Sequence, residues 1–415
     1  MNSNIPFEQQ EVIPPTELMS AWPHVLSFPP QPDGSPFPLS KPLIRNDGLL
    51  LVGTECNGLP GVMNRIFVTN FQNARNHSTP PTSHITVSQE VRDMHWIGMN
   101  AAIVAIGNEI HVILTWDEEI ATHSIFTIAD PIDTVHSDTI RELAVSSVPN
   151  STRILSGVLE SSQWRLDSGF DRTVVLSDLH GYTNPRASSV VTRFDACDVV
   201  SSLRWAGGDT QFSWTTDGGD FRIVDTRARP RSRPRQMLWS MGSHNLRTMG
   251  GLFTHEYLSG YQVALGFEHG HLAFLDTRMP RSVPYATIAS SLAAVGEIRR
   301  SNSGHFSLFG HGGFATAQTV VNPSQQLELG SIVRMQEHQI GTVQYKTSGD
   351  YSFNSEEYLA VSEKYGACCY FGTVIGMADR TRSCPSLGIV STYKVCSMAR
   401  AMATLIGAYE EPWDV

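Results

Sequence analysis

The clearest pattern in the chain is a short motif, spaced as apolar-x-x-apolar-x-apolar, that recurs along the sequence. Complete copies are Val91-x-x-Met94-x-Trp96, Ile140-x-x-Leu143-x-Val145, Val200-x-x-Leu203-x-Trp205 and Ile340-x-x-Val343-x-Tyr345, and partial copies begin at Leu246 and Leu292. Successive copies start 49, 60, 46, 46 and 48 residues apart, close to the roughly 40–50 residues of one propeller blade. The spacing predicts a repeat protein built from β-strands.

Each motif is followed by further short apolar runs that are separated by turn residues. The runs 101–106 and 211–216 precede Gly107-Asn108 and Asp217-Gly218-Gly219, and these residue types tolerate the positive φ that tight hairpins need. A four-stranded sheet cannot bury both of its faces alone. We therefore expect the sheets to stack radially until the ring closes and no long edge stays exposed.

The repeats predict an all-β chain that forms a seven-bladed β-propeller. Six copies of the motif supply six blades, and the strand-turn-strand region Leu43–Phe71 supplies one more. We expect a proline-rich N-terminal arm over residues 1–40, the propeller over 41–400 and a C-terminal tail over 401–415. The last blade needs an outer strand from one end of the chain. Met19–Phe28 and Gly388–Cys396 are both candidates, and the sequence does not choose between them.

Composition narrows the range of functions. The 415 residues carry 30 Lys and Arg against 40 Asp and Glu, a net charge of −10, which argues against sequence-independent nucleic-acid binding. The six cysteines form no C-x-x-C pair and are expected to be reduced thiols. Because no stretch of 18 apolar residues and no signal-peptide pattern occurs, we expect a soluble, intracellular protein that does not span a membrane.

Enzyme motifs are few. The string His311-Gly312-Gly313-Phe314 imitates the oxyanion loop of α/β-hydrolases, but no G-x-S-x-G elbow accompanies it, so a turn between strands explains it better. The sequence also lacks a Walker-type phosphate loop, an H-E-x-x-H metal motif and a dinucleotide-binding fingerprint. We expect no catalytic residues, no cofactor and no metal.

The ends of the third runs resemble those of the WD-repeat family. Trp116-Asp117 matches the dipeptide that closes WD blades. The more specific signatures are Asp225-Thr226-Arg227 and Asp276-Thr277-Arg278, each of which is soon followed by proline. Many unrelated functions share the WD propeller, so this likeness implies a fold and not a role.

The opening repeats resemble the methylosome WD-repeat subunit, the Valois family. The likeness rests on Asn46–Gly53, Arg65–Phe67 and Val91–Gly98, and more loosely on residues 225–227 and 270–277. It implies a non-catalytic partner of the type II protein arginine methyltransferase, in a hetero-oligomer of the cytoplasm and nucleus. The methyltransferase makes symmetric dimethylarginine on histone tails and Sm-type proteins. The small WD nucleoporin of the Y-shaped pore complex also resembles residues 225–278, and a structural scaffold of that type is the alternative.

In the methylosome family the first-blade loop docks on the methyltransferase. Carried over by position, the loop's Trp falls near Val62, and this sequence has no Trp there. The residues implied to bind the partner are Leu59, Pro60, Val62, Met63 and Arg65. Apolar side chains on a loop tip suit an interface because a partner covers them. The alternative is that these residues fold back onto the first blade.

A second candidate site is an arginine-rich linker. Alternate positions hold Arg227, Arg229, Arg231, Arg233 and Arg235. In an extended conformation the five guanidinium groups would line one face and could bind an acidic partner. The alternative is a solvated loop between blades.

Overall fold

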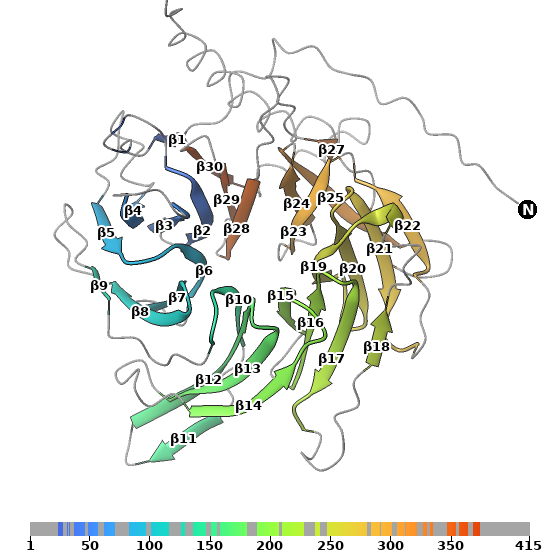
Figure 1. Ribbon diagram of the computed structural model, residues 1–415, viewed down its shortest axis with the longest axis horizontal. Coiled ribbons are helices and arrows are strands. Elements are labelled where there is room, and N and C mark those ends of the chain that lie inside the picture. The colour runs from blue at the N-terminus through green and yellow to red at the C-terminus, as the bar shows by residue number, and fades with distance from the viewer. Residues whose placement is uncertain are drawn as a thin grey trace, which may run out of the picture.

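The structure is a computed structural model that describes most of the predicted repeat region. The described residues are 24–27, 31, 33, 37–45, 49–56, 62–70, 83–96, 101–115, 126–128, 136–146, 151–155, 158–180, 189–206, 210–227, 237–240, 247–279, 284–290, 292–300, 305–311, 313–321, 327–329, 333–334, 347–353, 357–363 and 368–373. The described strands pair antiparallel into seven sheets, which we number I to VII (Figure 1). One short helical turn covers residues 247–249.

The strands of sheets I to IV follow the chain. Sheet I contains β2 (Leu39–Ile44), β3 (Leu49–Thr54), β4 (Asn64–Asn70) and β5 (Ser83–Val87). Sheet II contains β6 (Val91–Trp96), β7 (Ala101–Ile106), β8 (Glu109–Thr115) and β9 (Phe126–Ile128). Sheet III contains β10 (Ile140–Val145), β11 (Ser151–Leu155), β12 (Val158–Gly169), β13 (Thr173–His180) and β14 (Ser189–Asp195). Sheet IV contains β15 (Val200–Trp205), β16 (Gln211–Thr216), β17 (Asp220–Asp225) and β18 (Met237–Ser240).

Sheets V to VII complete the set. Sheet V contains β19 (Leu252–Tyr257), β20 (Gln262–Phe267), β21 (His271–Asp276) and β22 (Ala286–Ala289). Sheet VI contains β23 (Ala294–Arg300), β24 (His305–His311), β25 (Gly313–Val321), β26 (Leu327–Leu329) and β27 (Val333–Arg334). Sheet VII contains β28 (Thr347–Phe353), β29 (Glu357–Glu363), β30 (Cys368–Thr373) and, from the other end of the chain, β1 (His24–Ser27).

The sheets are arranged around a centre (Figure 1). Their innermost strands contact one another in the order β2, β6, β10, β15, β19, β23 and β28, and β28 contacts β2 again. The predicted all-β architecture of antiparallel sheets is confirmed. No described helix is long and apolar enough to cross a membrane.

A shared β-bulge explains the spacing of the sequence motif. Register shifts occur between Val91 and Asp93, Ile140 and Glu142, Val200 and Ser202, Leu252 and Thr254, and Val295 and Glu297. A bulge places two residues of one strand opposite a single residue of its neighbour. The apolar positions are therefore three residues apart across the bulge and two apart beyond it. All three apolar side chains of a motif then share one face of the innermost strand.

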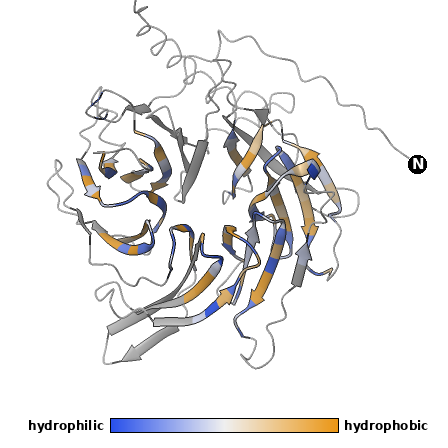
Figure 2. Ribbon diagram, in the orientation of Figure 1, coloured by the Kyte–Doolittle hydropathy of each residue, from blue (hydrophilic) through white to orange (hydrophobic). Residues whose placement is uncertain are grey.

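Clusters of buried hydrophobic residues lie between neighbouring sheets, and hydrophobic residues recur along the strands of these sheets (Figure 2). Leu51 and Val68 of sheet I pack in one cluster with Met94 and Val104 of sheet II. Further clusters join sheets II and III, III and IV, IV and V, and V and VI. Sheets I to VI thus bury hydrophobic residues against their neighbours in this series, as the radial stacking predicts.

Two expected repeat positions need correction. The partial copy at Leu246 is wrong, because the innermost strand β19 begins at Leu252 and residues 247–249 form a helical turn. In β19 the buried His255 occupies the second apolar position of the motif. Because His is polar, this copy does not match a motif defined by apolar residues. The copy expected at Leu292 begins three residues later, with Val295 and Ile298. The copy at 340–345 lies outside the described residues, and β28 supplies that innermost strand.

Ring closure uses the N-terminal candidate strand. β1 pairs antiparallel with β30 through His24 to Phe371 and Ser27 to Cys368. The other candidate, Gly388–Cys396, lies outside the described residues. β1 falls within the region predicted as an arm, and β2 begins two residues before the predicted boundary at residue 41.

Removing residues 1–27 is expected to open this closure. The truncated chain would leave the edge of β30 without its partner, and unpaired edges invite proteolysis and self-association. We expect faster cleavage in limited proteolysis and a larger species in size-exclusion chromatography. A truncated chain that stays monomeric and resists the protease like the full chain would contradict this role of β1.

Candidate functional site

The connection between β3 and β4, residues 55–63, is the first-blade loop. It is far longer than the equivalent turns of sheets II to V, which are residues 107–108, 170–172, 217–219 and 268–270. Those turns need little chain because Gly107, Gly219 and Gly270 adopt positive φ. The first-blade loop therefore contains residues that the reversal of the chain does not require.

A buried hydrogen-bond network holds both ends of the first-blade loop. Asn64 Oδ1 accepts hydrogen bonds from the backbone N of Cys56 at 2.7 Å and from Thr54 Oγ1 at 3.2 Å. Thr54 Oγ1 in turn accepts one from the backbone N of Arg65 at 2.8 Å. The loop thus leaves a fixed base, which lowers the entropy lost when a partner binds it.

Arg92 ties this base to the neighbouring sheets. Its guanidinium lies 3.3 Å from Glu55 of the loop and 3.2 Å from Glu90. It also lies 5.9 Å from the ring centroid of Phe170, in the turn between β12 and β13. Nothing in the sequence motif signals this contact, because Arg92 and Glu55 belong to different repeats.

The residues predicted to bind the partner differ in how exposed they are. Met63 is exposed at 55%, whereas Val62 is half-buried and packs against the cluster around Phe37. The Arg65 guanidinium stacks 4.9 Å from the ring centroid of Phe37. Leu59 and Pro60 lie outside the described residues. Met63 is therefore a described loop residue with an exposed side chain, while Val62 and Arg65 contact the first sheet.

The arginine linker is described only at its start. Arg227 Nη2 lies 2.6 Å from Asp225 Oδ2, and Arg227 Nε donates to Asp225 Oδ1 at 2.9 Å. Arg227 is thus engaged with its own strand end. The remaining members, Arg229, Arg231, Arg233 and Arg235, lie outside the described residues, so the predicted acidic-partner site stays a prediction there.

The two Asp-Thr-Arg signatures have the same geometry. In the second copy Arg278 Nη2 lies 2.5 Å from Asp276 Oδ2 and Nε donates to Oδ1 at 2.9 Å. The side-chain hydrogen bonds from Arg227 and Arg278 hold the pKa of Asp225 and Asp276 below the usual range. The sequence likeness between the copies therefore reflects one repeated strand-end structure.

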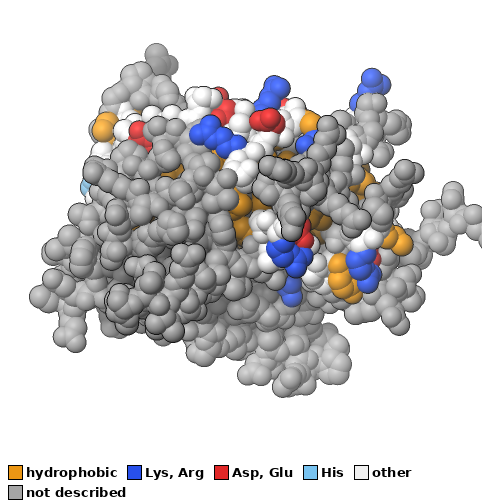
Figure 3. Space-filling model, turned by 90° about the horizontal axis from the view of Figure 1, so that it is seen from below, with side chains coloured by type: hydrophobic (Ala, Val, Ile, Leu, Met, Phe, Trp, Pro, Cys, Tyr) orange, Lys and Arg blue, Asp and Glu red, His pale blue; other side chains and the backbone are white. Residues whose placement is uncertain are grey.

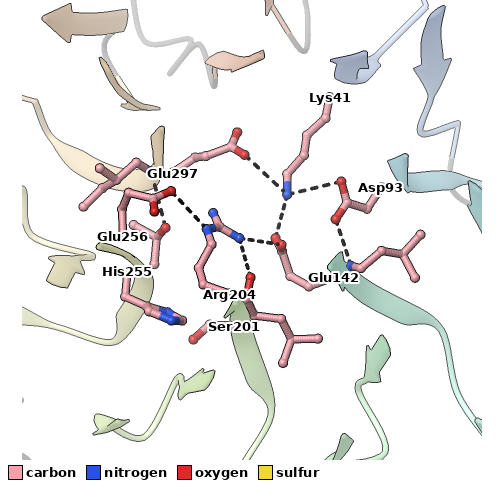
Figure 4. Close-up of polar contacts among 12 residues, drawn as sticks. Lys41, Asp93, Glu142, Ser201, Arg204, His255, Glu256 and Glu297 are labelled. Atoms are coloured by element: carbon pink, nitrogen blue, oxygen red, sulfur yellow. Dashed lines mark hydrogen bonds and ion pairs between the residues drawn. The ribbon is translucent and has the colours of Figure 1, made fainter. Parts of the chain in front are cut away.

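Charged side chains from six of the sheets meet at the centre of the ring (Figure 4). We call this group the central ion cluster, and its members are Lys41, Asp93, Glu142, Arg204, Glu256, Glu297 and Arg299. The central ion cluster occupies the x positions of the motif, on the face opposite the apolar residues. The sequence analysis did not predict the central ion cluster, because the repeat motif is defined by its apolar positions alone.

Lys41 is the hub of the central ion cluster. Its Nζ lies 2.7 Å from Glu142 and 3.5 Å from both Asp93 and Glu297. Asp93 Oδ2 also accepts a hydrogen bond from the backbone N of Leu143 at 2.9 Å. The cluster therefore joins the innermost strands of sheets I, II, III and VI.

Pairing shifts the ionisation of these buried groups. Burial alone would raise the pKa of Asp93, but the charge of Lys41, together with His95 and Arg299, outweighs it and holds that pKa well below the ordinary 3.8. Burial likewise opposes ionisation of Glu297, yet Arg299 and Lys41 hold its pKa below 4.5. Burial would lower the pKa of Lys41, and the three carboxylates raise it above 10.5 instead.

These shifts predict a pH dependence of stability. A carboxyl group whose pKa is lowered by folding stabilises the folded state at pH values above its ordinary pKa, and this stabilisation is lost as the pH falls. A Lys whose pKa is raised by folding stabilises the folded state at pH values below its ordinary pKa, and this stabilisation is lost at high pH. We expect the free energy of unfolding to fall below about pH 4, with Asp93 adding up to about 1.4 kcal/mol per pH unit to the slope. Urea unfolding of Asp93→Asn between pH 2.5 and 7 checks this, and an unchanged slope would contradict it.

Two groupings that resemble catalytic sites lie in a hairpin and in the buried interior of the described part of the chain. The His311–Phe314 string spans the hairpin between β24 and β25, where Gly310 pairs with Gly313. Ser213 Oγ lies 2.7 Å from His255 Nε2, but both residues are fully buried. Burial also keeps the pKa of His255 well below its ordinary value. No group of three or more described His, Cys, Asp or Glu residues is placed to hold a metal ion.

Comparisons with known proteins support the fold. No model of a known protein family matches the sequence, and no curated protein matches it. Among solved structures, the WD-repeat protein Sqt1 from Chaetomium thermophilum is similar with a TM-score of 0.55 and 11% identity, over 76% of this chain and 74% of that one. At this identity the likeness shows a WD-type β-propeller and nothing about function. The fold itself matches 1277 solved chains, so it does not discriminate among roles.

Proposed function

We propose that this chain is a seven-bladed, non-catalytic adaptor that binds a type II protein arginine methyltransferase in the cytoplasm and nucleus. In this proposal it helps to present Arg-rich substrates, such as histone tails and Sm-type proteins, for symmetric dimethylation. The observation that carries the proposal is the first-blade loop, which has a fixed base and an exposed Met63. The same loop belongs to the region that resembles the methylosome subunit.

The chemistry of the first-blade loop suits protein docking. Met side chains are adaptable and are enriched at interfaces. The network around Asn64 and the Arg92 to Glu55 ion pair fix the base of the loop before a partner arrives. The charge of −10 favours the approach of basic substrate tails through long-range attraction.

Affinity purification of the tagged full chain from its own cells tests the proposal. Mass spectrometry of the eluate should identify an arginine methyltransferase, and the eluate should form symmetric dimethylarginine on a histone H4 peptide. Recovery of nuclear pore scaffold subunits without this activity would instead favour the alternative scaffold function and would overturn the adaptor proposal.

A further inference from the structure

Two of the three exposed large apolar side chains among the described residues lie on sheet V. Tyr261, in the turn between β19 and β20, is 37% exposed, and Met279, after β21, is 60% exposed. The Arg278 guanidinium lies 3.7 Å from the ring centroid of Tyr261, and Met279 follows Arg278 in the chain. We call Tyr261, Arg278 and Met279 the sheet V patch. Right of centre in Figure 3, Lys or Arg side chains lie beside acidic and hydrophobic ones.

Hydrogen bonds fix the sheet V patch before any ligand binds. The carbonyl oxygen of Tyr261 accepts hydrogen bonds from the backbone N of Thr277 at 2.7 Å and from Thr277 Oγ1 at 2.9 Å. Asp276 holds the Arg278 side chain through Nε at 2.9 Å. A surface that is already ordered loses little conformational entropy when it binds a segment.

Sheet IV provides an internal comparison. There Thr226 donates from its backbone N at 2.8 Å and its Oγ1 at 3.0 Å to the carbonyl oxygen of Thr210, and Arg227 pairs with Asp225 in the same way. Thr210 therefore stands where sheet V has Tyr261. Because the strand end forms equally well with Thr, folding does not explain the exposed aromatic ring.

One hydrogen-bonding nitrogen of Arg278, in the sheet V patch, has no acceptor among the described residues. Asp276 accepts hydrogen bonds from Nε and Nη2 of Arg278, and no described residue accepts one from Nη1. The Arg278 side chain is 61% exposed. A free guanidinium edge binds carboxylates, and an adjoining aromatic ring with a Met side chain binds an aromatic residue. The complementary ligand is a segment with acidic and aromatic residues side by side.

The chain contains such a segment near its C-terminal end. Residues 409–414 read Tyr-Glu-Glu-Pro-Trp-Asp, three carboxylates and two aromatic rings. Residues 374–408 separate this segment from β30, and at about 3.3 Å per residue they can span on the order of 100 Å. We propose that the tail segment 409–414 docks on the sheet V patch.

The proposed contact lies on the face of the ring opposite the first-blade loop. Met63 is in a connection between second and third strands, whereas Tyr261 and Met279 are in connections before the second and after the third strand. In an antiparallel sheet these connections lie at opposite ends of the strands. Tail docking and partner docking are therefore separable by mutation.

The test uses the full chain with its own tail disabled by Glu410→Lys, Glu411→Lys and Trp413→Ala. A fluorescent peptide of residues 404–415 is titrated onto this chain and onto the unaltered chain by polarisation. We expect binding to the tail-disabled chain, and binding at least tenfold weaker to the unaltered chain, whose own tail competes at high effective concentration. Equal affinity for both chains, or no binding to either, would overturn the proposal.

Substitutions on the two faces identify the site. In the tail-disabled chain, Met279→Asp and Tyr261→Ala are each expected to weaken peptide binding at least tenfold. Met63→Asp makes the same chemical change on the other face and should leave peptide binding unchanged. Circular dichroism of each variant confirms folding. Peptide binding that survives both sheet V substitutions would place the tail elsewhere and overturn the proposal, whatever the result for the methyltransferase.

Discussion

Replacing Asp93 by alanine is expected to lower the free energy of unfolding by about 3–5 kcal/mol. Asp93 is 1% exposed and lies 3.5 Å from Lys41 Nζ. It also accepts backbone hydrogen bonds from Met94 at 3.0 Å and Leu143 at 2.9 Å. The substitution leaves a buried ammonium group with one carboxylate fewer and leaves the Leu143 N–H without its acceptor, and both changes cost free energy.

Urea unfolding at pH 7 measures this effect. The matched control is Asp138→Ala, because Asp138 is exposed and accepts only from the backbone N of its neighbour Thr139. We expect the control to cost less than about 1 kcal/mol. If Asp93→Ala and the control were equally mild, the central ion cluster would not hold the innermost strands together.

Met63→Asp is expected to weaken binding to the methyltransferase by about 30-fold or more, the loss of one interface hot spot. The change places a charge where an apolar side chain would be covered by the partner. Met63 is 55% exposed, so the free energy of unfolding should hardly change. Isothermal titration calorimetry with purified methyltransferase measures the affinity.

Val62 and Met279 supply the comparisons for this experiment. Val62→Asp should lower stability instead, because Val62 packs against the buried cluster around Phe37 and a carboxylate there would lose water. Met279→Asp, on the opposite face, should leave methyltransferase binding intact. Equal affinity of the Met63→Asp variant and the unaltered chain would remove the first-blade loop from the interface.

The sequence predicts the fold well because the spacing of its apolar residues repeats once per sheet. Val91, Met94 and Trp96 are three and then two residues apart, and that spacing is what a bulged innermost strand needs to turn three side chains toward the neighbouring sheet. The same logic fails at β19, where His255 is buried against Ser213 in place of an apolar residue. A hydropathy pattern does not predict the burial of a polar residue that is stabilised by a hydrogen-bond partner.

The candidate site was less predictable than the fold. Spacing and family likeness locate the loop that contains Met63, but they cannot tell that Val62 and Arg65 pack inward. The contact of Arg92 with Glu55 joins residues of different repeats. Such contacts depend on the angle between sheets, which short-range sequence patterns do not specify.

Reconstitution from purified proteins tests whether this chain is an adaptor of a type II arginine methyltransferase. Purified full chain and purified type II arginine methyltransferase are mixed and analysed by size-exclusion chromatography with light scattering, and the mixture is assayed on a histone H4 peptide. We expect a stable hetero-oligomer that forms symmetric dimethylarginine faster than the methyltransferase alone. Separate elution of the two proteins, with no change in the rate, would contradict the adaptor function.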